Sequence, residues 1–404
     1  MRLLGLEHVY WGLPLVMYPY LSGLVAGAFV VGSLSNVFGL KQFEPLTRLA
    51  AIMTLVFLIG APLGPLAEAV QRSRFWELYT RDHIPYSPLG LFIVIWTAYV
   101  ALVVAEIYYI FRIDNIYLAE HARGWRKFWH KLLTLGSRAT SETSRNRDHR
   151  VLVVLSTLGI LLAFGFHGYV GFVFGAIKAR PLWSNPLMMV LFIVSAIVSG
   201  IALMILAYVI IEGGLGTKKL DFRIIDGLMR LLMWMIFLDL FLDLVDILNA
   251  GVSAYTSAPI YRGFSQIFFV GGPLAFMYLG LQIGLLVVAM VMTLFGAVRR
   301  SPLGASLTAV FVLISVFAMR FDTVIGAELQ PKVSQGLVRY SLPIFGMDSV
   351  QVAIGILATM ILLIALALLL LPWDAGWMTV WAGQDREPDP EPHAAGPGSP
   401  KGGV

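Results

Sequence analysis

Long apolar runs alternate with short polar segments along almost the whole chain, up to residue 372. A helix of about 20 residues can cross a hydrocarbon core roughly 30 Å thick, and every run is long enough. Gly and Pro are scattered through the runs, as is typical of membrane helices, because neighbouring helices satisfy the freed backbone groups. We therefore predict nine transmembrane helices, at approximately 11–38, 46–70, 86–112, 151–177, 186–212, 226–251, 266–298, 301–321 and 348–372.

The composition agrees with this pattern, since 58% of the 404 residues are hydrophobic and 13% are charged. The length would allow two or three soluble domains, but this composition excludes them. The predicted fold class is an all-α, polytopic helical bundle in the membrane. Two boundaries stay open. The break at Arg299–Arg300 could also lie within one bent helix, and the segment 322–347 fits neither a span nor a short loop.

Basic residues fall on one side of the membrane if the nine spans alternate, and by the positive-inside rule that side is cytoplasmic. These residues are Lys41, Arg48, the run from Arg112 to Arg150, Lys218, Lys219, Arg223, Arg230, Arg299 and Arg300. The N-terminus is then predicted outside and the C-terminus inside.

The cytoplasmic loop 113–150 mixes basic residues with Trp125, Phe128 and Trp129, a pattern that predicts a helix lying in the membrane interface. A nucleic-acid interpretation of its charges is possible, but anionic lipid is the ordinary partner of such a patch, so we predict membrane lipid and no nucleic acid. The tail 373–404 is predicted to be disordered from about residue 384, because it is rich in Asp, Glu, Pro and Gly.

Two residue counts limit the redox chemistry of the chain. Cysteine is absent, so thiolates can hold no iron–sulfur cluster here. A membrane cytochrome needs pairs of intramembrane histidines as haem ligands, and only His167 of the seven histidines lies within a predicted span. We therefore predict no haem and no cluster in this chain.

The sixth predicted span carries a stripe of carboxylates, Asp239, Asp243 and Asp246, at positions i, i+4 and i+7 of one helix face. Charged groups at depth in a membrane cost roughly 2.5–3.5 kcal/mol each and often mark proton or ion pathways. We predict proton transfer along this stripe. The alternative is a structural role, in which the carboxylates pair with buried donors and Asp246 reaches the interface.

Alternation of the spans places Tyr18, Glu68, His167 and Tyr169 in one outer layer of the membrane. A single His with a Tyr is more often structural than catalytic. Four polar groups at one depth predict a pocket for an amphipathic ligand.

Two further polar features have weaker interpretations. Glu106, near the cytoplasmic end of the third span, either pairs with Arg112 or begins an inner half of a proton route. The segment 320–347, with Arg320, Asp322 and Glu328, is predicted to be a polar outer loop, which either binds a soluble partner or is an ordinary solvated loop.

Two stretches resemble the NrfD/polysulfide-reductase family of integral membrane subunits. LAEAVQRSRFWELYTRDHIPYSPLGLFIVIWTAY (66–99) is similar to the family's acidic, Arg-Phe-Trp and Ser-Pro sequence between the second and third spans. FHGYVGFVFGAIKARPLWSNPLMMVLFIVSAIVSGIAL (166–203) is similar to its fourth and fifth spans, and a diffuse likeness covers most of 10–370.

This resemblance implies a membrane subunit without haem that binds menaquinone or ubiquinone near the outer face of a bacterial or archaeal cell membrane. It also implies an extracytoplasmic 4Fe-4S ferredoxin-like partner and a molybdopterin catalytic subunit. Glu68 stands where the family has an acidic residue, and His167 and Tyr169 fall in the element that lines the quinone pocket. Where polysulfide-reductase members carry Asn and His, this chain has Leu15 and Tyr18, which makes Tyr18 the substitute donor.

The first functional hypothesis is thus a quinone-reacting membrane anchor of a respiratory oxidoreductase, with Tyr18, His167 and Tyr169 at the quinone and Glu68 transferring protons. The Asp stripe would then couple this chemistry to proton movement. A proton-coupled secondary transporter and a passive anchor without quinone chemistry are the alternatives. No internal repeat or matching pair of broken helices favours the transporter.

Overall fold

The computed structural model of the chain describes residues 8–80, 84, 86–180, 182–216, 219–256, 264–269, 271–332 and 336–374, and every regular element among them is a helix. The predicted tail lies outside these residues from position 375 on. In chain order the elements are α1 (Leu13–Phe38), η1 (Lys41–Leu46), α2 (Thr47–Gly60), α3 (Leu63–Glu68), η2 (Arg72–Arg74), α4 (Glu77–Thr80), α5 (Pro88–His121), α6 (Trp125–Leu133), α7 (Glu142–Gly175), α8 (Met188–Ala207), η3 (Tyr208–Glu212), α9 (Gly213–Leu215), α10 (Phe222–Thr256), η4 (Phe276–Gly284), α12 (Leu285–Leu294), α13 (Gly296–Arg299), α14 (Pro302–Val324), η5 (Gly326–Leu329) and α15 (Val350–Leu370).

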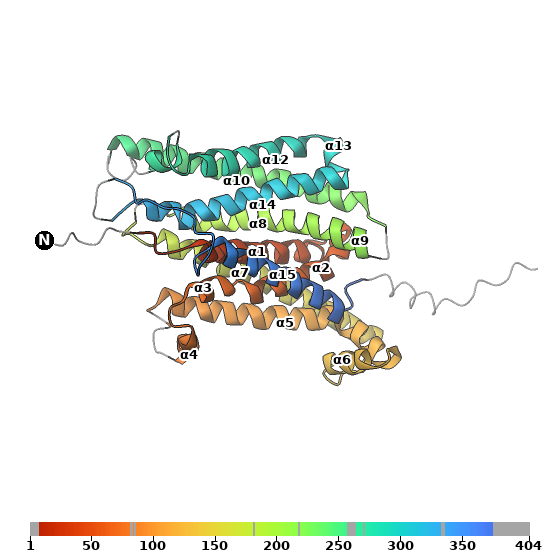
Figure 1. The fold of residues 1–404 in the computed structure, drawn as a ribbon. Helices are drawn as coiled ribbons and strands as arrows, with labels where there is room; N and C mark the ends of the chain where they lie inside the picture. Colours follow the sequence, from red (N-terminus) through yellow and green to blue (C-terminus); the bar gives the residue numbers. More distant parts are fainter. Residues whose placement is uncertain are drawn as a thin grey trace, which may run out of the picture.

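Eight helical segments within the described residues are long and apolar enough to cross a membrane. The long helix α10, 35 residues from Phe222 to Thr256, runs beside them and carries the Asp stripe (Figure 1). The described helices depart from the predicted spans at some ends. Helix α5 continues to His121. Residues 264–268 at the start of the seventh predicted span are helical, but turns at 271–274 separate them from the helical segment that begins near Phe276.

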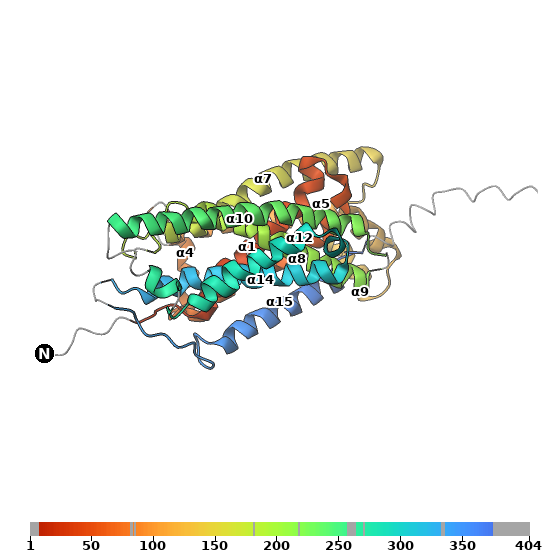
Figure 2. The ribbon, with the colours of Figure 1, turned by 90° about the horizontal axis from the view of Figure 1, so that it is seen from above.

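The helices lie side by side in one bundle (Figure 1). Helix α1 is central and packs against α2, α7, α8, α14 and α15. Seen from above, α7 and α15 lie on opposite sides of the bundle with α1, α8 and α14 between them (Figure 2). The closest approach is between α1 and α8, where a Cβ added to Gly27 would lie 2.1 Å from the carbonyl oxygen of Ala196. Glycine at this crossing lets the two backbones touch, as small residues do between membrane helices.

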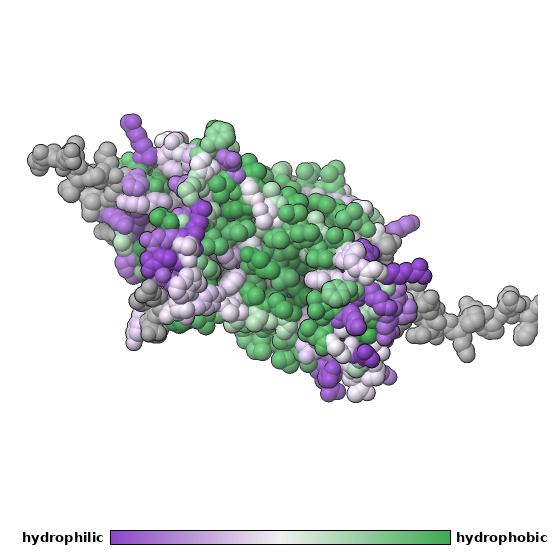
Figure 3. All heavy atoms as spheres, turned by 60° about the horizontal axis from the view of Figure 1, so that its bottom comes forward, coloured by the Kyte–Doolittle hydropathy of each residue, from purple (hydrophilic) through white to green (hydrophobic). Residues whose placement is uncertain are grey.

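The two ends of the bundle differ. We call the end with the start of α1 and the ends of α3, α7 and α14 the site end, and the opposite end, with α6 and α13, the basic end. An apolar band covers the middle of the molecule and hydrophilic side chains gather at both ends (Figure 3). Helix α6 lies in the segment where the sequence predicts an interfacial helix, and its Trp125, Phe128 and Leu132 are exposed.

A buried arginine fixes the basic end. Arg112 of α5 pairs with Asp148 of α7 and also donates hydrogen bonds to the Ser137 hydroxyl and the Ala139 carbonyl. Glu106 instead accepts a hydrogen bond of 2.6 Å from the Ser156 hydroxyl. The predicted Glu106–Arg112 pair is therefore not formed.

Candidate functional site

His167 of α7 is fully buried and holds one defined tautomer. Its Nδ1 lies 3.1 Å from the Ser22 hydroxyl of α1, and its Nε2 lies 3.1 Å from Nη2 of Arg320 on α14. A guanidinium can only donate hydrogen bonds, so Nε2 must accept and the proton resides on Nδ1. His167 is thus a neutral imidazole fixed between two helices.

Arg320 is a cation of the site end that has no exposed surface. The same Nη2 donates a 2.6 Å hydrogen bond to Ser195 of α8, and the guanidinium carbon lies 3.9 Å from the centre of the Phe192 ring. The charge of Arg320 also acts on Asp239 of α10. Arg320 therefore links α14 to α7 and α8, and within the described residues no hydrogen bond or salt bridge joins it to Asp239.

The sequence predicts that Arg320 and Asp322 lie in an outer loop, and this prediction is wrong. Helix α14 continues to Val324, and Glu328 in the following turn is only 2% exposed. The helix continues because the apolar residues between and after these two charges keep facing the bundle, and because unpaired backbone groups are costly in lipid. This part of the predicted loop is buried core and cannot bind a soluble partner.

The Asp stripe occupies one face of α10, as predicted. Asp239 and Asp243 are 3% and 8% exposed. Asp243 accepts a 3.5 Å hydrogen bond from the amide of Gln282, and Asp246 accepts one of 2.7 Å from Asn185. Both donors are neutral amides, so neither Asp243 nor Asp246 has a salt-bridge partner among the described residues.

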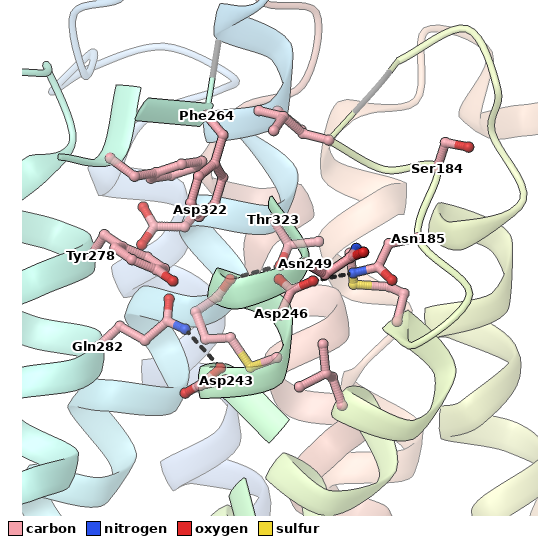
Figure 4. Close-up of a pocket in the computed structure, with 16 residues that line it drawn as sticks. Ser184, Asn185, Asp243, Asp246, Asn249, Phe264, Tyr278, Gln282, Asp322 and Thr323 are labelled. Carbon is pink, nitrogen blue, oxygen red and sulfur yellow. Dashed lines mark hydrogen bonds between the residues drawn. The ribbon is translucent and has the colours of Figure 1, made fainter. Parts of the chain in front are cut away.

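Asp243 and Asp246 line a cavity of about 100 Å³ at the site end (Figure 4). It lies between the start of α8, α10, η4 and the end of α14. Its other polar lining residues are Ser184, Asn185, Asn249, Tyr278, Gln282, Asp322 and Thr323. Asp239 lies one turn deeper on α10 and is not among the residues that line the cavity.

Glu68 caps the first turn of α1. Its Oε1 accepts hydrogen bonds of 3.0 Å from the backbone amides of Gly12 and Leu15. A carboxylate is favoured there because the first amides of a helix lack partners and the helix dipole is positive at that end. Glu68 therefore stabilises the start of α1. Its donor Leu15 lies about one helical turn before Tyr18 on α1.

Tyr18 and Tyr169 belong to one aromatic face between α1, α5 and α7. Phe92 joins them, with ring centres 5.6 Å from Tyr18 and 6.5 Å from Tyr169. The Tyr169 hydroxyl donates to the carbonyl of Pro88, 3.0 Å away, whereas the Tyr18 hydroxyl makes no hydrogen bond within the described part of the chain. We call Tyr18, Phe92 and Tyr169 the aromatic face.

The four residues predicted to share an outer layer thus lie at the same end of the bundle but divide in two. Tyr18, Tyr169 and Glu68 lie on the side of α3 and α5, while His167 points towards α14. The sequence alone assigns no role in this site to Gln282 or to Arg320. The sequence does contain a signal for both residues, because each is a polar side chain inside an apolar run. The Asp stripe is identified by the same signal.

A bundle of long apolar helices with hydrophilic side chains gathered at its two ends defines a polytopic membrane protein. The chain belongs to the NrfD family, because the family model "Polysulphide reductase, NrfD" matches residues 5–332. A selenate reductase subunit from Mesobacillus selenatarsenatis is 30% identical over 379 residues, which cover 90% of this chain and 85% of that protein.

Two further relatives match over a smaller part of their own length. The Hdr-like menaquinol oxidoreductase integral membrane subunit of Archaeoglobus fulgidus is 25% identical over 56% of this chain and 49% of its own. Protein NrfD of Escherichia coli is 27% identical over 50% of this chain and 61% of its own.

Proposed function

We propose that this chain is the membrane subunit of a respiratory oxidoreductase and that it reacts with quinone or quinol at the site end. The aromatic face carries this proposal. A quinone ring is flat and apolar with two polar oxygens, so it suits a wall of aromatic rings with one hydroxyl that lacks a partner. The relative from Archaeoglobus fulgidus, whose name refers to menaquinol, supports menaquinone, and ubiquinone has the same headgroup chemistry.

Tyr18 and Tyr169 would contact the headgroup directly, with Tyr18 donating to a quinone oxygen. Glu68 would exchange the protons, since reduction of a quinone consumes two of them and a carboxylate beside the ring oxygens is a suitable donor. His167 would not contact the headgroup directly, because its imidazole faces Arg320. It would act on the quinone site through its neighbours. Asp239, Asp243 and Asp246 would continue the route towards the cavity, while Arg320 would stay protonated and hold a fixed positive charge beside it.

The electrons would pass to or from a 4Fe-4S ferredoxin-like subunit bound at the site end, and a molybdopterin subunit would hold the catalytic centre. This arrangement needs the site end to face the outside of a bacterial or archaeal cell membrane. The distribution of Lys and Arg supports that orientation, since the basic end then faces the cytoplasm, as does the C-terminus.

Replacing Glu68 with Gln tests the proton transfer. The amide oxygen of Gln can still accept from Gly12 and Leu15, so α1 keeps its cap, but the group no longer carries a proton. General acid–base catalysis contributes typically about 10²–10⁴-fold, so we expect quinone-linked turnover of the assembled complex to fall by at least about a hundredfold. Activity with a soluble dye should be unchanged. Full quinone-linked turnover in this variant would exclude Glu68 from the reaction.

Replacing Tyr18 with Phe tests the headgroup contact. The ring remains against Phe92 while the hydroxyl is lost, and one hydrogen bond is worth roughly 0.5–1.5 kcal/mol. We expect the KM for quinol to rise by about two- to tenfold. Tyr20→Phe is the matched control, because Tyr20 packs on Phe317 of α14, away from the aromatic face. Equal effects of the two variants would contradict the assignment.

A further inference from the structure

The acidic cavity at the site end contains a carboxylate that the Asp stripe does not include. Asp322 lies on α14, opposite α10, and is only 5% exposed. Neither of its two oxygens has a hydrogen-bond partner within the described residues. Figure 4 shows it beside Tyr278 in the wall of the cavity.

Three carboxylates share this cavity, and no basic side chain is among its described lining residues. Tyr278 lines the same cavity as Asp243, Asp246 and Asp322. An unpaired carboxylate in a dry interior would be very costly. The Asp322 carboxyl group must therefore be hydrated, protonated or both.

The cavity has room for water and offers it partners. Water occupies about 30 Å³ per molecule in the liquid, so a cavity of about 100 Å³ holds several. Each buried water needs two to four polar partners, and the carboxylates, Tyr278 and Gln282 provide them. A metal ion fits less well, because within the described residues no three acidic or histidine side chains are arranged to hold one.

The backbone on one side of the cavity is also unusual. Segment η4 is a π-helix, and such segments occur frequently at functional sites. It carries Tyr278 and Gln282 four residues apart, both facing the cavity, while the Ser315 hydroxyl of α14 donates to the Gln282 carbonyl at 2.6 Å. This hydrogen bond fixes the π segment against α14.

We propose that the cavity is a hydrated port that takes protons from, or returns them to, the aqueous phase at the site end, with Asp322 as its proton-carrying carboxylate. A hydronium ion transfers its proton to the Asp322 carboxylate and leaves water. Through that water the proton passes to Asp246 or Asp243, and Asp322 is again ionised. The coupling of this port to electron transfer rests on the proposed quinone reaction, but its hydration does not.

Thiol chemistry tests the hydration directly, because the chain has no cysteine and each variant therefore has a single thiol. The full chain, purified in detergent, carries Asp322→Cys or the control Ala318→Cys, one turn away on α14 and 1% exposed. Methyl methanethiosulfonate is small and reacts with thiolates, and a thiol in apolar surroundings stays protonated. We expect Asp322→Cys to react at least about tenfold faster, measured by intact mass. Equal, slow rates would overturn the port.

A second variant tests proton transfer in the assembled complex. Asp322→Asn keeps the shape of the side chain but cannot carry a proton. We expect quinone-linked turnover to fall by about tenfold or more, with dye-linked activity unchanged. Asp348→Asn is the control, an exposed acid at the same end and outside the cavity. Normal turnover in Asp322→Asn would overturn the role of Asp322. If the natural complex shows no quinone turnover, the proposed function fails while the thiol rates still decide on the port.

Discussion

Replacing Arg320 with Met is expected to cost about 3–5 kcal/mol of folding free energy, because it removes one partner of a buried charge network. The substitution leaves Nε2 of His167 and the Ser195 hydroxyl without their donor. It also removes the only buried cation whose charge acts on Asp239 among the described residues. We expect little folded protein in the membrane, measured as the monodisperse fraction after extraction in detergent.

Two further variants separate the charge of Arg320 from its geometry. Arg320→Lys keeps the charge but loses the planar contact with Phe192 and the fork of donors, so we expect an intermediate loss. Combining Arg320→Met with Asp239→Asn removes both charges at once. The double variant should be more stable than Arg320→Met alone, since the carboxylate that Arg320 balanced is then neutral as well. If the two losses add without compensation, Arg320 does not balance Asp239.

The apolar runs predict the membrane helices well because lipid demands that every backbone group be paired within its helix. The apolar runs predict the end of a helix poorly where charged residues are buried inside the bundle. The sequence places Arg320 and Asp322 at the start of a loop, since charges usually leave the membrane. In the folded chain α14 continues past both, because each is enclosed by neighbouring helices that no local pattern reveals.

In the candidate site, the sequence predicts how deep each side chain lies in the membrane but not which neighbouring helix it faces. Counting residues from the ends of the spans places Tyr18, Glu68, His167 and Tyr169 at one end of the bundle, and the structure agrees. The rotation of each helix decides which way a side chain points, and it is set by packing. His167 and Tyr169, two residues apart on α7, therefore face different neighbours.

The two halves of the site lie on opposite sides of α1. The aromatic face lies between α1, α5 and α7, and the acidic cavity lies between α8, α10, η4 and α14. His167 and Arg320 are the buried contacts between these halves, since His167 also reaches Ser22 of α1. His167 of α7 is hydrogen-bonded to both Ser22 of α1 and Arg320 of α14, so this junction needs a fixed spacing of its helices.

Replacing Gly27 with Leu should change that spacing and is expected to destabilise the bundle strongly. Even a single added carbon would lie 2.1 Å from the Ala196 carbonyl oxygen and 2.6 Å from the Gly200 Cα, both backbone atoms that no rotamer change can move. Overpacking typically costs about 1–3 kcal/mol, and we expect the upper end of this range or more because α1 and α8 must separate.

Gly165→Leu is the matched control for Gly27→Leu. Gly165 lies within α7, one turn from Tyr169, and a Cβ added there meets no atom within 4 Å. Both variants add the same side chain to the middle of a membrane helix, so they differ only in what the side chain meets. The thermal midpoint of the purified chain should fall sharply for Gly27→Leu and little for Gly165→Leu. Similar midpoints would mean that the α1–α8 crossing can widen, in which case the junction at His167 does not depend on this contact.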